Sequence, residues 1–185
     1  MGGLFGKGVD RMPDWAFRTM ALFFRLRDPL LAVDRRLEAF DIKPGQTVVD
    51  YGCGPGSYLR RASELVGPAG RVLAVDIHEL AILSANRRIR RHDLANVSAH
   101  LTAGGSCPLA DGVADVVYAL DMFHMVADTD GFLKELRRIT KPDGVLFLED
   151  GHQARKISKA KLAAAHCWQI IAEDKRGLKC RPLPP

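Results

Sequence analysis

Two kinds of hydrophobic pattern alternate along the chain. Short apolar runs rich in β-branched residues are typical of strands buried in a parallel sheet. Apolar residues spaced three or four apart are typical of helices that cover such a sheet. We expect strands over 47–50, 71–76, 96–101, 113–120 and 144–150, and helices over 58–66, 79–92, 128–139 and 156–165. This alternation predicts an α/β fold with helices on both faces of the sheet.

Two further strands are expected at the end of the chain, over 167–173 and 177–183. They are close enough together to form an antiparallel hairpin, which brings the sheet to seven strands. The 185 residues suit one domain with a substantial core. Within it we distinguish an N-terminal helical segment (1–43), a core (44–150) and a closing part (151–185).

The N-terminal segment is unusually rich in aromatic and aliphatic side chains, with arginines between them. A helix is expected from Pro13 onward, and Asp28-Pro29 is expected to end it before a second amphipathic stretch up to residue 40. Three interpretations remain open. The helices pack against the sheet, or they form a lid whose Trp15 to Phe24 supply an apolar acceptor pocket, or they touch a membrane surface as interfacial helices.

The chain from Thr47 to Ser57 combines a strand, a glycine loop and a helix start. Gly52, Gly54 and Gly56 alternate through the loop, and Ser57 is the expected N-cap of the next helix. Glycines at this spacing allow positive φ and let a ligand approach bare main chain. Because a helix start carries unpaired N–H groups, it favours a polar or anionic ligand. The pattern predicts a nucleotide-type site.

Two carboxylates identify the kind of nucleotide. The dinucleotide fingerprint Gly-x-Gly-x-x-Gly would need glycine at Ser57, and Asp50 is poorly suited to lie beside a pyrophosphate. A carboxylate there suits a ligand with an ammonium group. Asp76 ends the second strand, where it can accept both hydroxyls of a ribose. A ligand with a ribose, an amino-acid head and no phosphate is S-adenosylmethionine.

Four motifs now resemble those of the class I S-adenosylmethionine-dependent methyltransferases. Val48 to Ser57 is similar to their motif I, and residues 74–77 (Ala-Val-Asp-Ile) to their second motif. Residues 115–121 are similar to the fourth-strand motif, and residues 141–149 to the turn into the fifth strand. The resemblance covers residues 44–150 in order, and small single-domain members of the methyltransferase type 11 kind are the most similar.

This resemblance implies a three-layer, Rossmann-like sheet of order 3-2-1-4-5-7-6 with an N-terminal helical lid. It also implies a set of cofactor-binding residues: Asp50, Tyr51, Gly52, Cys53, Gly54, Gly56, Asp76, Ile77, Gly104, Leu120 and Asp121. One position departs from the family. Where members usually carry an acidic residue for the adenine amino group, this chain has Ala103, so backbone groups alone are expected to hold the adenine.

Methyl transfer needs alignment and exclusion of water more than it needs acid–base chemistry. If the acceptor must lose a proton, His124 after the fourth strand is the candidate base. The alternative is a surface or packing histidine. Trp15 and Phe24 are expected on the apolar side of the acceptor, and Glu149 and Asp150 at the end of the fifth strand on its polar side.

Composition limits the kinds of partner that we expect this protein to bind. The net charge is +5, but the arginine pairs are spread over several predicted helices, which favours solvated faces over a nucleic-acid stripe. The four cysteines have no metal-binding spacing, so we expect free thiols, no metal and a cytoplasmic location. No signal peptide or apolar run long enough to span a bilayer is present. The sequence does not predict the oligomeric state.

We therefore expect an S-adenosylmethionine-dependent methyltransferase acting on a small, partly apolar molecule by direct transfer. Three alternatives remain. The basic balance is compatible with a tRNA or rRNA methyltransferase, although an Asn-Pro-Pro-Tyr-type motif is missing. Ala103 and the lack of an obvious catalytic dyad are compatible with a non-catalytic cofactor-binding protein. The glycine spacing disfavours a nicotinamide oxidoreductase.

Overall fold

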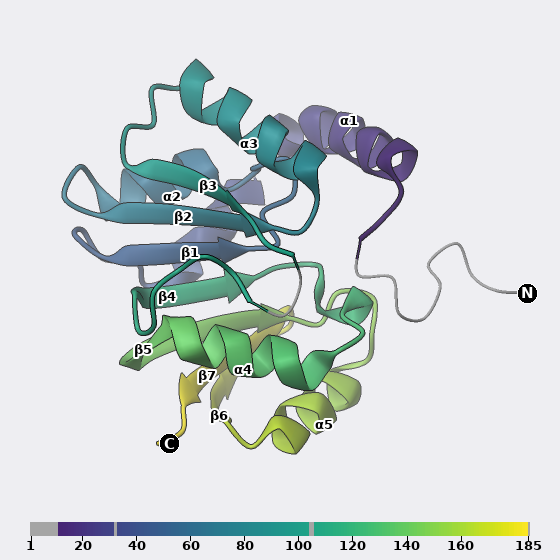
Figure 1. The fold of residues 1–185 in the computed structure, drawn as a ribbon, viewed down its shortest axis with the longest axis vertical. Helices are drawn as coiled ribbons and strands as arrows, with labels where there is room; N and C mark the ends of the chain where they lie inside the picture. Colours follow the sequence, from purple (N-terminus) through teal and green to yellow (C-terminus); the bar gives the residue numbers. More distant parts are fainter. Residues whose placement is uncertain (1–10, 32, 104–105, 185) are drawn as a thin grey trace, which may run out of the picture.

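The computed structural model describes residues 11–31, 33–103 and 106–184. Within these ranges it describes all side chains except those of residues 29–34. Its centre is a seven-stranded sheet of order β3-β2-β1-β4-β5-β7-β6, which confirms the predicted order (Figure 1). The strands are β1 (Thr47–Tyr51), β2 (Arg71–Asp76), β3 (Val97–Leu101), β4 (Ala114–Ala119), β5 (Thr140–Glu149), β6 (Trp168–Glu173) and β7 (Gly177–Pro182).

The first five strands pair in parallel, and β7 pairs antiparallel with both β5 and β6. The predicted hairpin at the end of the chain is therefore confirmed. The helices are α1 (Asp14–Leu31), α2 (Leu59–Val66), α3 (Glu79–Arg91), α4 (Thr129–Ile139) and α5 (Arg155–Ala165), with 3-10 helices η1 (Val33–Phe40) and η2 (Phe123–Met125).

Two hydrophobic cores lie on opposite faces of the sheet. One contains Val49 of β1 with Leu136 of α4 and Leu162 of α5, and the other contains Val48 with Leu59 of α2 and Ala85 of α3. All six of these side chains are fully buried or nearly so. Because side chains alternate along a strand, β1 serves both cores. The three-layer architecture follows from this alternation.

The topology defines where a ligand can bind. β1 pairs with β2 on one side and with β4 on the other, so the chain changes direction across the sheet between β1 and β4. In open α/β sheets, ligands bind outside the carboxyl ends of the strands at this switch point. The glycine loop after β1 and η2 after β4 both lie there.

The N-terminal helices differ from the prediction. Helix α1 continues through Asp28-Pro29 and ends at Leu31, and the next stretch is the 3-10 helix η1 rather than an α-helix. Pro29 lies in the last turn of α1, where its missing N–H removes only a hydrogen bond to the carbonyl of Arg25, whose side chain is exposed to solvent. A proline near the end of a helix is thus tolerated without a break.

Candidate active site

The loop after β1 is anchored to the end of β2 through the backbone. The amides of Gly52 and Cys53 donate to the same carbonyl, that of Val75, at 2.8 and 3.0 Å. Gly52 has a φ of +83°, and a Cβ there would lie 3.0 Å from Cγ of Met122. Only glycine meets both conditions without strain. The loop therefore presents main chain to a cavity that Gly52 and Gly54 help to line.

Asp76 closes the loop from the β2 side. Its carboxylate accepts hydrogen bonds from the amides of Gly54 and His78, both at 2.8 Å. Burial raises the pKa of this carboxyl, and the two amide donors oppose that rise. The side chain lines the cavity, so Asp76 fixes the loop at the cavity wall.

Asp50 lies deeper, beneath the loop. It is 2% exposed, and its Oδ2 has no hydrogen-bond partner among the described residues. Burial raises the pKa of Asp50 to about 8, and the nearby charge of Asp76 adds to this rise. A buried acid without a cationic partner is costly to ionise. It is the arrangement expected of a group that meets its positive partner only when a ligand is bound.

Ser57 does not cap the following helix as predicted. Helix α2 begins at Leu59, its N-cap is Tyr58, and no side chain accepts a hydrogen bond there. The hydroxyl of Ser57 is buried without a partner, and the residue lines the cavity. The helix starts one residue later than a cap at Ser57 would place it. Gly56, with a φ of +81°, turns the chain before the helix begins. The serine hydroxyl is thereby left available to a ligand.

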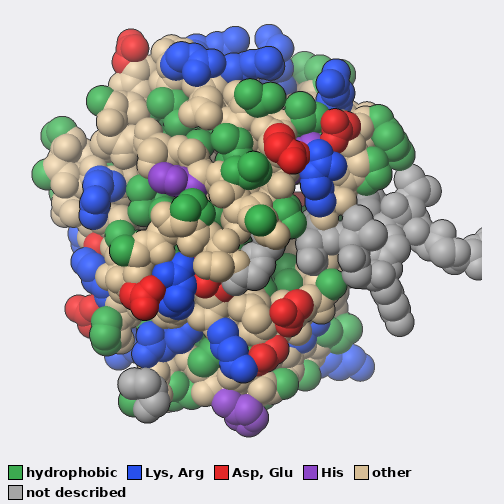
Figure 2. All heavy atoms as spheres, in the orientation of Figure 1, with side chains coloured by type: hydrophobic (Ala, Val, Ile, Leu, Met, Phe, Trp, Pro, Cys, Tyr) green, Lys and Arg blue, Asp and Glu red, His purple; other side chains and the backbone are tan. Residues whose placement is uncertain are grey.

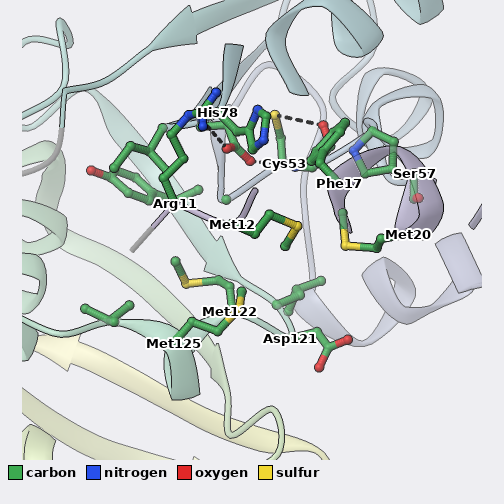
Figure 3. Close-up of a pocket in the computed structure, with 18 of the residues that line it drawn as sticks. Arg11, Met12, Phe17, Met20, Cys53, Ser57, His78, Asp121, Met122 and Met125 are labelled. Atoms are coloured by element: carbon green, nitrogen blue, oxygen red, sulfur yellow. Dashed lines mark hydrogen bonds between the residues drawn. The ribbon is translucent and has the colours of Figure 1, made fainter. Parts of the chain in front are cut away.

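Helix α1 roofs the cavity with one face. Phe17, Met20 and Phe24, spaced three and four residues apart, line it from above. Methionines on the opposite wall, Met122 and Met125 of the η2 region, face the same hollow (Figure 3). The cavity is therefore polar along the glycine loop and apolar between α1 and η2.

A cluster of contacts holds α1 against the start of α3. Arg11 donates to Glu79 at 2.7 and 3.0 Å and to Asp14 at 2.8 Å. The ring of Phe17, 3% exposed, lies 4.5 Å from that of His78, centroid to centroid. His78 in turn caps α3, since its Nδ1 accepts from the amide of Leu80 at 3.2 Å. The predicted lid is thus a helix docked at the cofactor-side loop of β2.

Most of the predicted cofactor residues meet in this cavity. Its lining includes Tyr51, Gly52, Cys53, Gly54, Asp76, Ile77, Leu120 and Asp121. Asp50, beneath the loop, and Gly56, within it, do not line the cavity. Gly104 lies outside the described residues. The carboxyl ends of β1, β2 and β4 bring these residues together, as their order in the sheet requires.

The predicted acceptor residues are only partly brought together. Phe24 lines the cavity, but Trp15, 60% exposed, points away from it on the outer face of α1. Glu149 lines a neighbouring cavity and pairs with Arg36 at 3.2 Å. Asp150 lines neither cavity and pairs with Arg155 at 2.6 Å. Trp15 and Asp150 thus line neither cavity, and their role at the acceptor stays a prediction.

His124 also lies apart from the cavity lining. Its ring contacts that of His152 edge to face, with centroids 4.7 Å apart, and it packs against Gly151. Burial lowers its pKa, and the neighbouring His152 lowers it further. The residue precedes Met125, which does line the cavity, so the turn of η2 directs the two side chains differently. That His124 follows β4 in the sequence does not show which way its side chain points.

Several cavity residues were not assigned to the ligand site from the sequence. They are Arg11, Met12, Arg27, Arg36, Pro55, Ser57, Tyr58, His78, Thr102, Met122, Met125, Val126, Asp128, Phe132 and Glu135. Phe17 and Met20 lie within the stretch from Trp15 to Phe24 that was expected at the acceptor. The helical spacing of Phe17, Met20 and Phe24 is a signal that could have separated the inner face of α1 from Trp15. The residues after β4 carry no such periodic signal, because a 3-10 helix as short as η2 is a single turn and its hydrophobic spacing cannot recur.

Comparison with known proteins identifies the family of this chain. A family model described as a methyltransferase domain matches residues 42–179. A nocamycin O-methyltransferase of Saccharothrix syringae is 33% identical over 110 residues, 60% of this chain and 39% of that one. A demethylmenaquinone methyltransferase of Lactobacillus johnsonii is 31% identical over 121 residues, 64% of this chain and 49% of that one. The chain thus spans between a third and a half of these curated relatives.

Among solved structures, one described as a SAM-dependent methyltransferase from Aquifex aeolicus superimposes with a TM-score of 0.76 at 24% identity. The match covers 94% of this chain and 100% of that one, and it shows a shared fold. The family match covers the glycine loop, Asp76 and all seven strands except the last residues of β7. This chain belongs to the class I S-adenosylmethionine-dependent methyltransferases, the family whose cofactor is S-adenosylmethionine.

Proposed function

We propose that the protein transfers a methyl group from S-adenosylmethionine to a small, neutral and partly apolar acceptor. The observation that carries this proposal is the division of one cavity into a polar side, formed by the glycine loop and Asp76, and an apolar side between α1 and η2. A cofactor held on the polar side would present its methyl group toward the apolar side. The acceptor then needs apolar surface to bind there.

The residues present fit the cofactor. The glycine loop allows close approach of a ligand to main chain, and the hydroxyl of Ser57 and Oδ2 of Asp50 are buried without partners. We assign Asp76 to the ribose hydroxyls, and Asp50 and the loop amides to the amino-acid head. Tyr51, Cys53, Ile77, Leu120 and Asp121 would complete the binding surface. When bound, S-adenosylmethionine supplies an already activated methyl group on a sulfonium.

The charges around the cavity favour an acceptor without an anionic group. Each of the three lining arginines already has a carboxylate partner: Arg11 has Glu79, Arg27 has Asp28 and Arg36 has Glu149. An anionic acceptor would have to displace one of these carboxylates. A neutral acceptor can bind against the apolar lining of α1 and η2 without displacing any of these carboxylates.

This chain contributes to the reaction mainly by positioning and by excluding water. Phe17, Met20 and Phe24 close the cavity above the acceptor region, and Met122 and Met125 close it from the other side. A dry, pre-shaped cavity lowers the cost of bringing the reacting groups into line. Since His124 lies outside the lining, we assign no general base, which fits an acceptor that needs no strong base.

Calorimetric titration with S-adenosylmethionine and S-adenosylhomocysteine, at low and moderate salt, tests the cofactor part of the proposal. We expect micromolar binding of both, insensitive to salt. Methyl incorporation from labelled cofactor into panels of neutral aromatic and aliphatic molecules then tests the acceptor part. Binding of NADH with none of S-adenosylmethionine would contradict the proposal, and so would methyl incorporation confined to RNA with steep salt dependence.

A further inference from the structure

Helix α1 is apolar on two sides, and only one side is packed. Phe17, Met20 and Phe24 face the cavity, whereas Trp15, Leu22, Phe23 and Leu26 are between 60% and 63% exposed. Trp15, Leu22 and Leu26 are seven and four residues apart, which places them on one stripe of the helix. Phe23 borders this stripe. We call these four side chains, with Leu83 of α3 at 51% exposure, the outer apolar patch.

This exposure is concentrated rather than scattered. Of the eight large hydrophobic side chains that are exposed among the described residues, five belong to the outer apolar patch. Helices α1 and α3, which carry them, pack against each other. Isolated exposed hydrophobic residues need no explanation, but a group concentrated on two helices that pack together indicates a surface that binds a partner.

Unpaired arginines lie on the same two helices as the patch. Arg18 and Arg25 on α1, and Arg87, Arg90 and Arg91 on α3, are exposed, and none forms an ion pair with another described residue. The acidic side chains of these two helices, Asp14, Asp28 and Glu79, are all bound to Arg11 or Arg27 instead. Figure 2 shows basic side chains gathered along the edge over α3, with hydrophobic ones over α1 beside them. The surface is therefore apolar and positively charged at once.

We propose that this surface, the outer apolar patch with its five arginines, docks onto an anionic lipid bilayer. Aromatic and aliphatic side chains of an interfacial helix enter the boundary between headgroups and acyl chains, and arginines beside them bind anionic headgroups. Among the described residues these arginines have no carboxylate partner, so anionic lipid supplies the complementary charge. Among the described residues no helix is long and apolar enough to cross a membrane, so the contact is a surface one.

The two faces of α1 connect this surface to the cavity. The helix whose outer face meets lipid has Phe17, Met20 and Phe24 on its inner face, so docking would place the roof of the cavity at the bilayer. A partly apolar acceptor dissolved in the membrane would then have a short path to the site. This consequence rests on the proposed function, whereas the docking itself does not.

Vesicle co-sedimentation tests the docking. Wild-type protein is mixed with vesicles of phosphatidylcholine alone, or with about one third phosphatidylglycerol, at low and moderate salt. We expect binding at least tenfold stronger to the anionic vesicles, weakening as salt rises. The double variant Leu22→Ser/Leu26→Ser is expected to lose at least tenfold in binding. Ile171→Ser, at a 40% exposed residue of β6, is its matched control and should bind like wild type.

A pair of single charge variants tests the electrostatic part. Arg25→Gln removes an arginine of the surface, and Lys156→Gln removes an exposed cation of α5 elsewhere on the molecule. Only Arg25→Gln should weaken binding. All these side chains are exposed, so the variants are expected to fold, and circular dichroism with thermal unfolding verifies this.

Tryptophan fluorescence supplies a second measurement. The protein has two tryptophans, Trp15 in the patch and Trp168, which is 5% exposed and donates to the carbonyl of Leu133. Brominated anionic lipid should quench Trp15 and leave Trp168 unaffected, so quenching should disappear in Trp15→Phe. Equal vesicle binding by wild type and the Leu22/Leu26 variant would overturn the proposal. So would a wild-type dimer that binds no vesicles and becomes monomeric in that variant, because a second copy would then be the occupant.

Discussion

At the scale of single residues, the two carboxylates beside the glycine loop differ in their hydrogen bonds. Asp76 accepts from the amides of Gly54 and His78, so it is paired before any ligand arrives. Asp50 has an Oδ2 without a partner and a pKa raised by burial to about 8. The first is therefore suited to shape the loop and bind hydroxyls, and the second to bind a cationic group.

Replacing Asp76 by alanine should weaken cofactor binding by about 2–3 kcal/mol. The ribose hydroxyls would lose their acceptor, and hydrogen bonds to a charged group are worth roughly this much. Calorimetry with S-adenosylhomocysteine measures the change. Asp143→Asn, at an exposed residue of β5 away from the cavity, is the control and should bind normally. Unchanged affinity in Asp76→Ala would mean that the ribose is held elsewhere.

Asp50 should make stability depend on pH in a defined direction. Its pKa is about 8 in the folded protein and near 3.8 when unperturbed, so between these values the unfolded chain binds fewer protons. The free energy of unfolding therefore falls as pH rises from about 4 to 8. Asp50→Asn removes this contribution, so at pH 8 the variant should be more stable than wild type by about 1–3 kcal/mol.

Denaturant unfolding of both proteins at several pH values checks this prediction. The advantage of Asp50→Asn should shrink steadily toward pH 4, while its affinity for S-adenosylmethionine is reduced at neutral pH. Asp76 and Glu149, whose pKa values burial also raises, are present in both proteins and cancel in the comparison. Parallel stability curves for the two proteins would show that Asp50 is ionised in the folded state at low pH.

At the scale of elements, α1 is an attached roof rather than part of the central sheet. Its attachment to the core includes the Arg11 ion pairs and the packing of Phe17 against His78. The ion pairs are largely exposed, and exposed pairs contribute little. The buried ring of Phe17, 3% exposed, is therefore expected to hold the helix in place.

Phe17→Ala should loosen α1 without unfolding the sheet. Loss of a buried phenylalanine costs up to about 3–5 kcal/mol, and here the cost falls on the docking of one helix. Hydrogen exchange of the α1 amides should accelerate, and cofactor affinity should fall because the cavity loses its roof. Phe23→Ala, at a 60% exposed position of the same helix, is the control. Protection of α1 that stays the same in Phe17→Ala would place the anchor elsewhere.

At the scale of the whole molecule, the site joins the glycine loop, β2, η2 and α1, so a ligand there should stabilise the entire fold. At a concentration of S-adenosylhomocysteine one hundred times its dissociation constant, stability should rise by about 2.7 kcal/mol. For a protein of this size that is roughly 5–10 °C in melting temperature. Thermal unfolding with and without the ligand measures it, and NADH is the control. A melting temperature raised by NADH alone would favour a nicotinamide site.

The order of strands and helices was predictable because each element carries its own local signal. Val48 and Val49 indicate a buried strand, the glycines after them a turn with positive φ, and Asp128 a helix start that the structure confirms through its bond to Gly131. Signals of this kind depend on neighbours in sequence. For the same reason, the carboxylates at the ends of β1 and β2 could be assigned to one site before their distances were known.

Side-chain direction at the cavity was decided by tertiary structure. Trp15 and Phe17 are two residues apart in one aromatic stretch, yet one is 60% exposed and the other 3%, because α3 packs on only one side of α1. His124 and Met125 are adjacent, yet only Met125 lines the cavity. Sequence alone determined which elements form and in what order, since hydrophobic period and turn residues are local. Which face of α1 and of η2 meets the ligand depends on packing between segments far apart in the chain, and only the assembled fold decides it.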